Sequence, residues 1–335
     1  MTPADVSTRP MALRPVALAQ GGWMQREQAV MGTAVTVQVW ADDRTRGAAA
    51  MAAVMAEMQR IDRCYSPHRA DSELSIVNAA AAQGPVRISD ELFQLVARAQ
   101  EFSRLTGGAF DITYASAGVL YDYREGVLPD DISLARAVQA IGWRHLQLDP
   151  MTPAIHFTRP GVRIDLGGFA KGHAVDRCCA LLQRHGIHHA IVSAGGDSRV
   201  LGDRRGRPWT IAIRDPRQPG GVVALLPLQD VAVSTSGDYE RCFVRDGVRH
   251  HHLLDPRTGR SPSHVRSVTI VAPDGLSAEA LGKAVFVLGV ERGLQLVEQR
   301  KDCDAVVIDA EGRLHCTQGF ESLQPATAAA QRVRA

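Results

Sequence analysis

Apolar residues recur along this chain with two different spacings, which predict helices in some segments and strands in others. Apolar side chains stand three or four positions apart in several long segments, as one face of a helix requires. These segments are residues 45–63, 91–105, 131–141, 168–185, 276–290 and 291–300. Residues 32–40 instead alternate apolar and polar side chains and are rich in β-branched residues, which is typical of a strand. Similar short segments are residues 190–195, 209–215, 222–228, 231–236 and 267–273.

The order of these segments predicts the fold class. Residues 145–149 and 154–158 form one predicted hairpin, and residues 304–317 form another around a Glu-Gly turn. Long helices therefore alternate with runs of several consecutive strands. This order predicts an α+β fold with mostly antiparallel sheets and packed helices, and it argues against a doubly wound parallel sheet.

The length and composition of the chain allow one large domain. It has 335 residues, 45% of them hydrophobic and 22% charged, as in ordinary globular domains. We expect residues 26–322 to form a single domain with two sub-lobes. Residues 1–25 are expected to be a flexible leader and residues 323–335 a disordered tail.

Charge and hydropathy argue against two kinds of partner. The net charge is +2 and Lys and Arg form no run, so neither nucleic acid nor a membrane surface is expected. No segment has about 18 consecutive apolar residues, so no membrane span is expected either.

The compartment is predicted from the N-terminal sequence and the cysteines. The apolar stretch near the N-terminus is broken by Arg14, Pro15 and Gln20, and no Cys follows that could carry a lipid. The adjacent Cys178 and Cys179 point to different faces of a predicted helix and favour reduced thiols. These features predict a cytoplasmic protein, with the periplasm as the alternative.

Residues 163–172, R-I-D-L-G-G-F-A-K-G, form a candidate anion site. Asp165 and two glycines follow a predicted strand, and Lys171 lies in the first turns of the next helix. Glycines let a ligand approach the backbone closely, and the free N–H groups at a helix start favour an anion. Lys171 is then placed to reach a phosphate or a carbonyl group. The alternative is a tight strand–helix turn with a solvated lysine.

A second candidate segment is H-H-H-L-L-D-P-R-T-G at residues 250–259. Asp255 begins a favourable turn sequence, so we expect it to form a turn. Three consecutive histidines suggest a metal, but neighbours on a strand alternate faces, so at most two of them converge. His252 precedes an apolar pair at a strand end, where a structural role is the alternative to a chemical one.

Short blocks in a fixed order resemble the ApbE family. They are M-G-T at 31–33, D-S-E-L-S-x-x-N at 71–78, G-A-F-D-I-T at 108–113, D-L-G-G-x-A-K-G-x-A-V-D at 165–176, G-G-D-x-R at 195–199, I-R-D-P at 213–216, T-S-G-D-Y at 235–239, H-x-L-D-P-R-T-G at 252–259 and A-x-A-L at 278–281. The resemblance covers about residues 26 to 320. It implies the T-fold-like architecture of that family.

The activity implied by this resemblance is that of an FAD:protein FMN transferase, or flavinyltransferase. Such an enzyme moves FMN from FAD onto a Thr or Ser of a target flavoprotein, forms a phosphodiester bond and releases AMP. The acceptor is expected to carry a short Asp-Gly-x-Thr-type motif. Two alternatives stay open: an FAD pyrophosphatase that yields FMN and AMP, and a non-catalytic FAD-binding protein with a degenerate metal site.

The resemblance also assigns residues to the site. It implies FAD contacts from Met31, His68, Ala109, Phe110, Asp111, Asp165, Lys171 and Leu253. His68 is a departure, because the family has an aromatic residue there, although a histidine still stacks or hydrogen-bonds. The implied Mg²⁺ ligands are the backbone carbonyl of Gly168 and the carboxylate of Glu279.

The predicted helix at residues 276–290 departs from the family at the metal site. The family pattern A-D-A-L-x-T reads A-E-A-L-G-K at residues 278–283. Glu279 keeps an oxygen ligand, but a charged Lys283 has three donors and no acceptor, so it does not bind a cation. Lys283 either pairs with Glu279 or points at the phosphates. We take Lys171 and Lys283 as the charges of the reaction and His252 as its proton acceptor.

Overall fold

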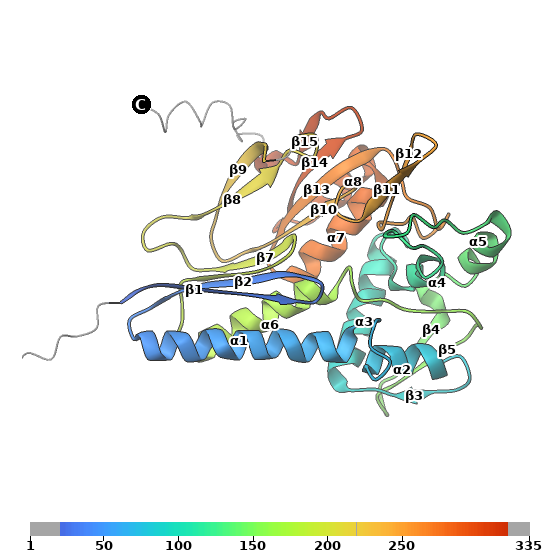
Figure 1. Ribbon diagram of the computed structural model, residues 1–335, viewed down its shortest axis with the longest axis horizontal. Helices are drawn as coiled ribbons and strands as arrows, with labels where there is room; N and C mark the ends of the chain where they lie inside the picture. Colours follow the sequence, from blue (N-terminus) through green and yellow to red (C-terminus); the bar gives the residue numbers. More distant parts are fainter. Residues whose placement is uncertain (1–20, 219, 321–335) are drawn as a thin grey trace, which may run out of the picture.

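An eight-stranded antiparallel sheet forms the centre of the computed structural model, which describes residues 21–218 and 220–320 (Figure 1). Its strands lie in the order β1-β2-β6-β7-β10-β13-β14-β15. They are β1 Gly22–Val30, β2 Thr33–Ala41, β6 Ala190–Ala194, β7 Asp197–Leu201, β10 Ala232–Gly237, β13 Val265–Ala272, β14 Asp304–Asp309 and β15 Leu314–Cys316. Every neighbouring pair in this sheet is antiparallel, which confirms the predicted class.

Four helices pack along this sheet, and a hairpin covers its other face (Figure 1). The helices are α1 Arg44–Tyr65 on β1 and β2, α6 Ala170–Arg184 on β6 and β7, and α7 Gly275–Leu288 on β10 and β13, with α8 Val290–Glu298 on β14. The hairpin consists of β8 Trp209–Arg214 and β9 Val222–Leu228. In β13, Ile270 therefore belongs to the helix-side core and Val271 to the cluster around Trp209. Burial on both faces explains the consecutive apolar residues 270–272 of this strand.

Several of the remaining elements lie at one end of α1 (Figure 1). The helices are α2 Glu73–Ala80, α3 Asp90–Leu105, α4 Ala115–Gly118 and α5 Asp131–Val138, with 3-10 turns η1 Ile112–Tyr114, η2 Trp143–His145 and η3 Gln318–Phe320. The strands are β3 Val86–Arg87, β4 Leu146–Asp149 and β5 Ala154–Phe157, and the hairpin β11 Cys242–Arg245 with β12 Val248–His251. The pairing of β4 with β5 confirms the hairpin predicted at residues 145–158.

β1 is an element that the sequence analysis missed. It begins at Gly22, inside the segment predicted as a leader, and pairs along its whole length with β2. Residues 25–27 of this edge strand are all exposed and polar, so the alternation typical of a strand is absent. Met31 and Gly32 close the hairpin with φ values of 56° and 68°, as a type I′ turn requires. The rest of the predicted leader and the predicted tail lie outside the described residues.

Cys178 and Cys179 on α6 are buried and form no disulfide, in agreement with the prediction of reduced thiols. Burial raises the pKa of both thiols, which makes them poor nucleophiles. None of the helices in the described part of the chain is both long enough and apolar enough to cross a membrane.

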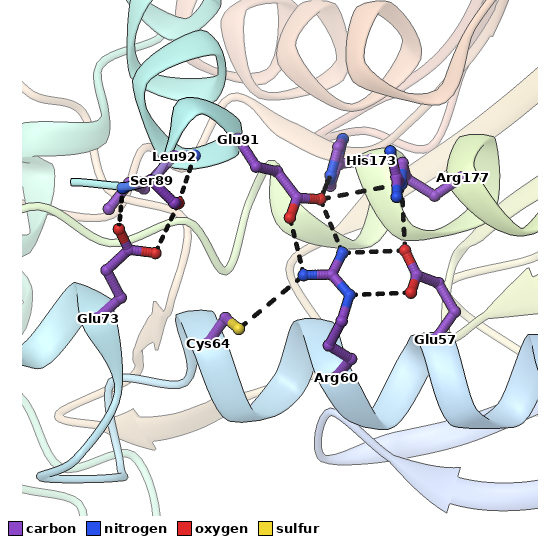
Figure 2. A network of polar contacts seen from close by, with 9 residues as sticks. All are labelled: Glu57, Arg60, Cys64, Glu73, Ser89, Glu91, Leu92, His173 and Arg177. Atoms are coloured by element: carbon purple, nitrogen blue, oxygen red, sulfur yellow. Dashed lines mark hydrogen bonds and ion pairs between the residues drawn. The ribbon is translucent and has the colours of Figure 1, made fainter. Parts of the chain in front are cut away.

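A charged network ties α6 to α1 and α3 (Figure 2). Arg60 of α1 donates to Glu57 of the same helix and to Glu91 of α3, at 2.9 and 2.7 Å. His173 and Arg177 of α6 contact the same two carboxylates, at 2.7 Å from Glu91 and 3.1 Å from Glu57 respectively. Burial alone raises the pKa of Glu91, but the hydrogen bonds from Arg60 and His173 outweigh it and lower this pKa to about 2. The network therefore fixes α6 against two neighbouring helices.

Arg60→Met should lower the free energy of unfolding by about 2–3 kcal/mol, because it removes the charged donor shared by two half-buried carboxylates. Urea unfolding measures the loss. Arg98→Met is the matched control, since Arg98 pairs with Glu101 at the surface, where such pairs contribute at most about 1 kcal/mol. Equal losses in the two variants would contradict this role of Arg60.

Candidate functional site

Two lysines and two carboxylates meet where α6, β7 and α7 approach one another. Lys171 Nζ lies 2.8 Å from Asp197 Oδ2 and 2.5 Å from Glu279 Oε1. Lys283 Nζ lies 3.6 Å from the same Glu279 oxygen. The Glu279 side chain is fully buried and that of Asp197 is 5% exposed. We call these four residues the lysine–carboxylate cluster.

Close packing of α6 on α7 brings Glu279 into this cluster. Gly172 and Gly275 face each other at the contact, and a Cβ on Gly172 would collide with the Gly275 carbonyl oxygen. The short approach lets the Gly172 N–H donate to Glu279 Oε2 at 2.8 Å. Asp176 of α6 accepts from the Gly275 N–H at 2.8 Å and so binds the N-terminus of α7. A larger residue at either glycine would separate the two helices.

Lys171 has protein acceptors for all three of its N–H donors. Besides Asp197 and Glu279, the Gly167 carbonyl oxygen accepts at 3.1 Å. Burial alone lowers the pKa of Lys171, but the two carboxylates outweigh it and raise this pKa. The other oxygen of Asp197 accepts from Ser234 Oγ at 2.6 Å. Lys171 is therefore a protonated crosslink between α6, β7 and α7.

Lys283 is held more loosely than Lys171. Its pair with Glu279 is the only ion pair of Lys283 within residues 21–218 and 220–320, and 3.6 Å is long for a hydrogen bond. Its aliphatic stem lies against the backbone of Gly168, where an added Cβ would stand 3.2 Å from Lys283 Cε. Burial lowers the pKa of Lys283, and Glu279 offsets this in part. The Lys283 side chain is 18% exposed.

His252 lies directly after β12 and borders the cluster. Its backbone N–H donates to the Arg241 carbonyl oxygen at 3.1 Å, while its ring Nδ1 is buried and has no hydrogen-bond partner in the structure. Burial lowers the pKa of His252 to about 3, and the charges of Lys283 and Arg241 add to this effect. The imidazole is therefore neutral at pH 7 and free to accept a proton.

The comparisons with known proteins identify the family of this chain. A sequence model of the ApbE family matches residues 31–307. The chain belongs to the ApbE family. A relative named FAD:protein FMN transferase, from Treponema pallidum, is 35% identical over 88% of this chain and 87% of its own length. A second relative of that name, from Vibrio cholerae, is 34% identical over 72% of this chain and 74% of its own length.

Solved structures of ApbE proteins have the same fold. The crystal structure of the ApbE protein from Thermotoga maritima superposes with a TM-score of 0.83 at 31% identity, over 90% of this chain and 98% of that one. The flavin transferase ApbE from Vibrio cholerae gives a TM-score of 0.79 at 29% identity, over 91% and 100% of the two chains. The predicted architecture is thereby confirmed.

Within this ApbE fold, the residues of the G-A-F-D segment are buried. Ala109 and Phe110 are 5% and 4% exposed. Asp111 accepts hydrogen bonds from the N–H groups of Thr113 at 2.9 Å and Trp143 at 2.7 Å, so it organises its own loop. Burial raises the pKa of Asp111, although these hydrogen bonds oppose the rise. The FAD contacts of these residues stay predictions.

The other FAD contacts implied for an ApbE chain lie on several loops. Asp165 precedes α6, and its Oδ1 accepts from the Gly167 N–H at 2.5 Å. Leu253 follows the histidine run and is 7% exposed. Met31 lies in the β1–β2 turn and His68 in the exposed loop after α1. Their roles toward FAD also stay predictions.

The three consecutive histidines have three different surroundings. His250 stacks on Phe243 with ring centroids 5.4 Å apart, and His251 Nε2 lies 2.9 Å from the Pro262 carbonyl oxygen. His252 alone borders the lysine–carboxylate cluster. No group of three or more His, Cys, Asp or Glu in the described residues has an arrangement suited to a metal ion.

Asp197 and Ser234 are site residues that the sequence analysis did not single out. Both lie in or beside family-like blocks, but nothing in those blocks distinguishes them from turn or strand residues. They face each other in the pairing of β7 with β10. The sequence contains a signal for each residue: Asp197 directly follows two glycines, and Ser234 lies inside a short apolar strand. These signals become informative only when the pairing of β7 with β10 is known.

Lys171→Met should lower the free energy of unfolding by about 3–5 kcal/mol, because it leaves two buried carboxylates without their shared cation. Lys301→Met is the control, since Lys301 is exposed and lies outside the site. Urea unfolding of both variants at pH 7 measures the difference. A Lys171→Met protein as stable as the parent would show that Lys171 is not a structural crosslink.

Proposed function

We propose that this chain transfers the FMN group of FAD to a Thr or Ser hydroxyl of a partner flavoprotein. The hydroxyl oxygen forms a bond to the FMN phosphorus, and the bond from that phosphorus to the bridging oxygen breaks. AMP leaves with the bridging oxygen, the hydroxyl proton passes to a base, and FMN remains on the partner as a phosphodiester. The observation that carries this proposal is a neutral, unpartnered histidine beside a loosely held lysine in an ApbE-family chain.

His252 is the proposed base. Its Nδ1 has no hydrogen-bond partner among the described residues, so this nitrogen can accept a proton without breaking an internal hydrogen bond. The low pKa of His252 depends in part on the neighbouring Lys283 and Arg241 charges. A diphosphate bound among these cations adds negative charge and raises the pKa of the imidazole, which makes it a stronger base in the complex.

The start of α6 is the proposed place for the diphosphate. Phe169 at the N-cap makes no side-chain capping bond, and two glycines precede it. The N-terminus of a helix favours an anion. Lys283 lies against Gly168 in this loop. FAD contacts from Met31, His68, Ala109, Phe110, Asp111, Asp165 and Leu253 belong to the same proposal, and the FAD contact that the resemblance implies for Lys171 stays a prediction.

The acceptor is proposed to be a flavoprotein with an Asp-Gly-x-Thr-type motif, the chemistry expected from the family resemblance. The cytoplasmic location expected from the N-terminal sequence stays a prediction, because residues 1–20 lie outside the described part of the chain.

Incubation with FAD and an acceptor flavoprotein should yield one AMP for each acceptor that gains the mass of an FMN group. Intact-mass spectrometry and chromatography of the nucleotides measure the two products. An acceptor with its motif Thr replaced by Val is the control and should remain unmodified. Release of FMN and AMP without an acceptor would indicate a pyrophosphatase instead, and FAD that stays intact would indicate a non-catalytic binding protein.

His252→Gln should reduce the rate of transfer by about 10²- to 10⁴-fold, the usual contribution of a general base. FAD affinity should change little, because the ring nitrogen acts on the acceptor hydroxyl. His156→Gln on β5 is a matched control outside the cluster and should keep the parent rate. Parent-like transfer by the His252 variant would rule out this residue as the base.

A further inference from the structure

The lysine–carboxylate cluster contains equal numbers of positive and negative groups. Asp197 and Glu279 contribute the two carboxylates, and Lys171 and Lys283 contribute the two ammonium groups. A buried charge is tolerated when an opposite charge lies beside it. Without a bound anion, the site therefore reaches neutrality with its own side chains, and a divalent cation added to it would leave an excess of two positive charges.

The oxygen atoms of the two carboxylates already have donors. Glu279 Oε1 contacts both lysines and Oε2 accepts from the Gly172 N–H. Asp197 Oδ2 contacts Lys171, and its Oδ1 accepts from Ser234 Oγ. Magnesium needs near-octahedral oxygen ligands with free lone pairs. The residues present do not fit the Mg²⁺ site that the family resemblance implies at Gly168 and Glu279.

Lys283 occupies the position next to both implied ligands. It stands one helical turn after Glu279 on α7, with its stem against the Gly168 backbone. Lys171 already has three protein acceptors, whereas Lys283 has one distant carboxylate. Of the two lysines, Lys283 therefore has donors to offer to a ligand.

Lysine is rare in this chain, which makes its presence at position 283 informative. Lys and Arg together number 38, and Lys stands only at positions 171, 283 and 301, so the other 35 are Arg. Elsewhere the chain thus uses arginine almost without exception. A lysine ammonium is a compact charge that fits between Glu279 and Gly168, while the broader planar guanidinium does not occupy the same volume.

We propose that Lys283 is a built-in cation that binds the diphosphate of FAD in place of a divalent metal. FAD binding, and the transfer that rests on the function proposed above, then need no magnesium. Because the ammonium group is covalently held, chelators do not remove it. The inference concerns the source of positive charge and is independent of whether the nucleophile is a protein hydroxyl or water.

The direct test is titration of FAD into the whole chain, with the Kd measured by isothermal titration calorimetry. The titration is done once with EDTA and once with magnesium. The parent should bind FAD with the same Kd within about twofold in both solutions. Lys283→Met should weaken binding about tenfold or more, a difference of about 1.4 kcal/mol. Lys301→Met should behave as the parent. Parent protein that loses FAD under EDTA and recovers it with magnesium would overturn the proposal, as would unchanged binding by Lys283→Met.

A second variant tests the charge balance without FAD. Lys283→Thr removes one ammonium group and supplies a hydroxyl, which leaves an excess negative charge beside Gly168. This variant, alone or combined with Glu279→Asp, should bind magnesium measurably by calorimetry, while the parent should not. The fold should survive, because Lys171 still pairs with both carboxylates, and circular dichroism checks this. Magnesium binding by the parent equal to that of the variant would overturn the proposal.

These readouts separate the two proposals of function. A parent that binds FAD independently of magnesium but modifies no acceptor would contradict the transferase activity and support the role of Lys283. A parent that transfers FMN only when magnesium is present would support the activity and contradict the role of Lys283.

Discussion

The burial of two neighbouring carboxylates is the constraint on which the rest of the site depends. Glu279 is fully buried on α7 and Asp197 almost so on β7, and both lie against one lysine. Without that lysine, two like charges would face each other away from water, which costs several kcal/mol. Lys171 offsets this cost only while α6, β7 and α7 stay at fixed distances from one another. The Lys171 ammonium group therefore couples the positions of three separate elements.

Contacts on two opposite sides of α6 keep this helix in the position that the Lys171 ion pairs require. Residues two apart on a helix point about 200° away from each other, since each residue turns the helix by about 100°. Lys171 therefore faces α7 and β7, while His173 faces Glu91 and the network on α1 and α3 (Figure 2). On the α7 side, Gly172 allows the helices to touch. Weakening either side lets α6 rotate and moves the ammonium group away from its carboxylates.

Local patterns predicted most elements but only part of the site. The helical spacing in residues 45–63, 91–105 and 168–185 gave α1, α3 and α6 within a few residues, because each helix buries one regular face. The strand β1 was not predicted, because its exposed edge residues are polar and the alternation of apolar and polar side chains is absent. The ordered blocks located the segments that carry Lys171, His252 and Glu279. They did not reveal Asp197, because its role is created by the register of β7 against β10, which no local pattern contains.

In the proposed function, Lys283 would link the binding of FAD to the strength of His252 as a base. In the free protein, Lys283 contributes to the low pKa of His252, while burial lowers the pKa of Lys283 itself. A diphosphate beside Lys283 favours its protonated form and screens its charge from the imidazole, so the pKa of His252 rises when the substrate is in place. A metal ion with two charges would lower the pKa of His252 in the same direction as Lys283 and more strongly. A single tethered ammonium group therefore suits a site in which the base must become effective only after FAD has bound.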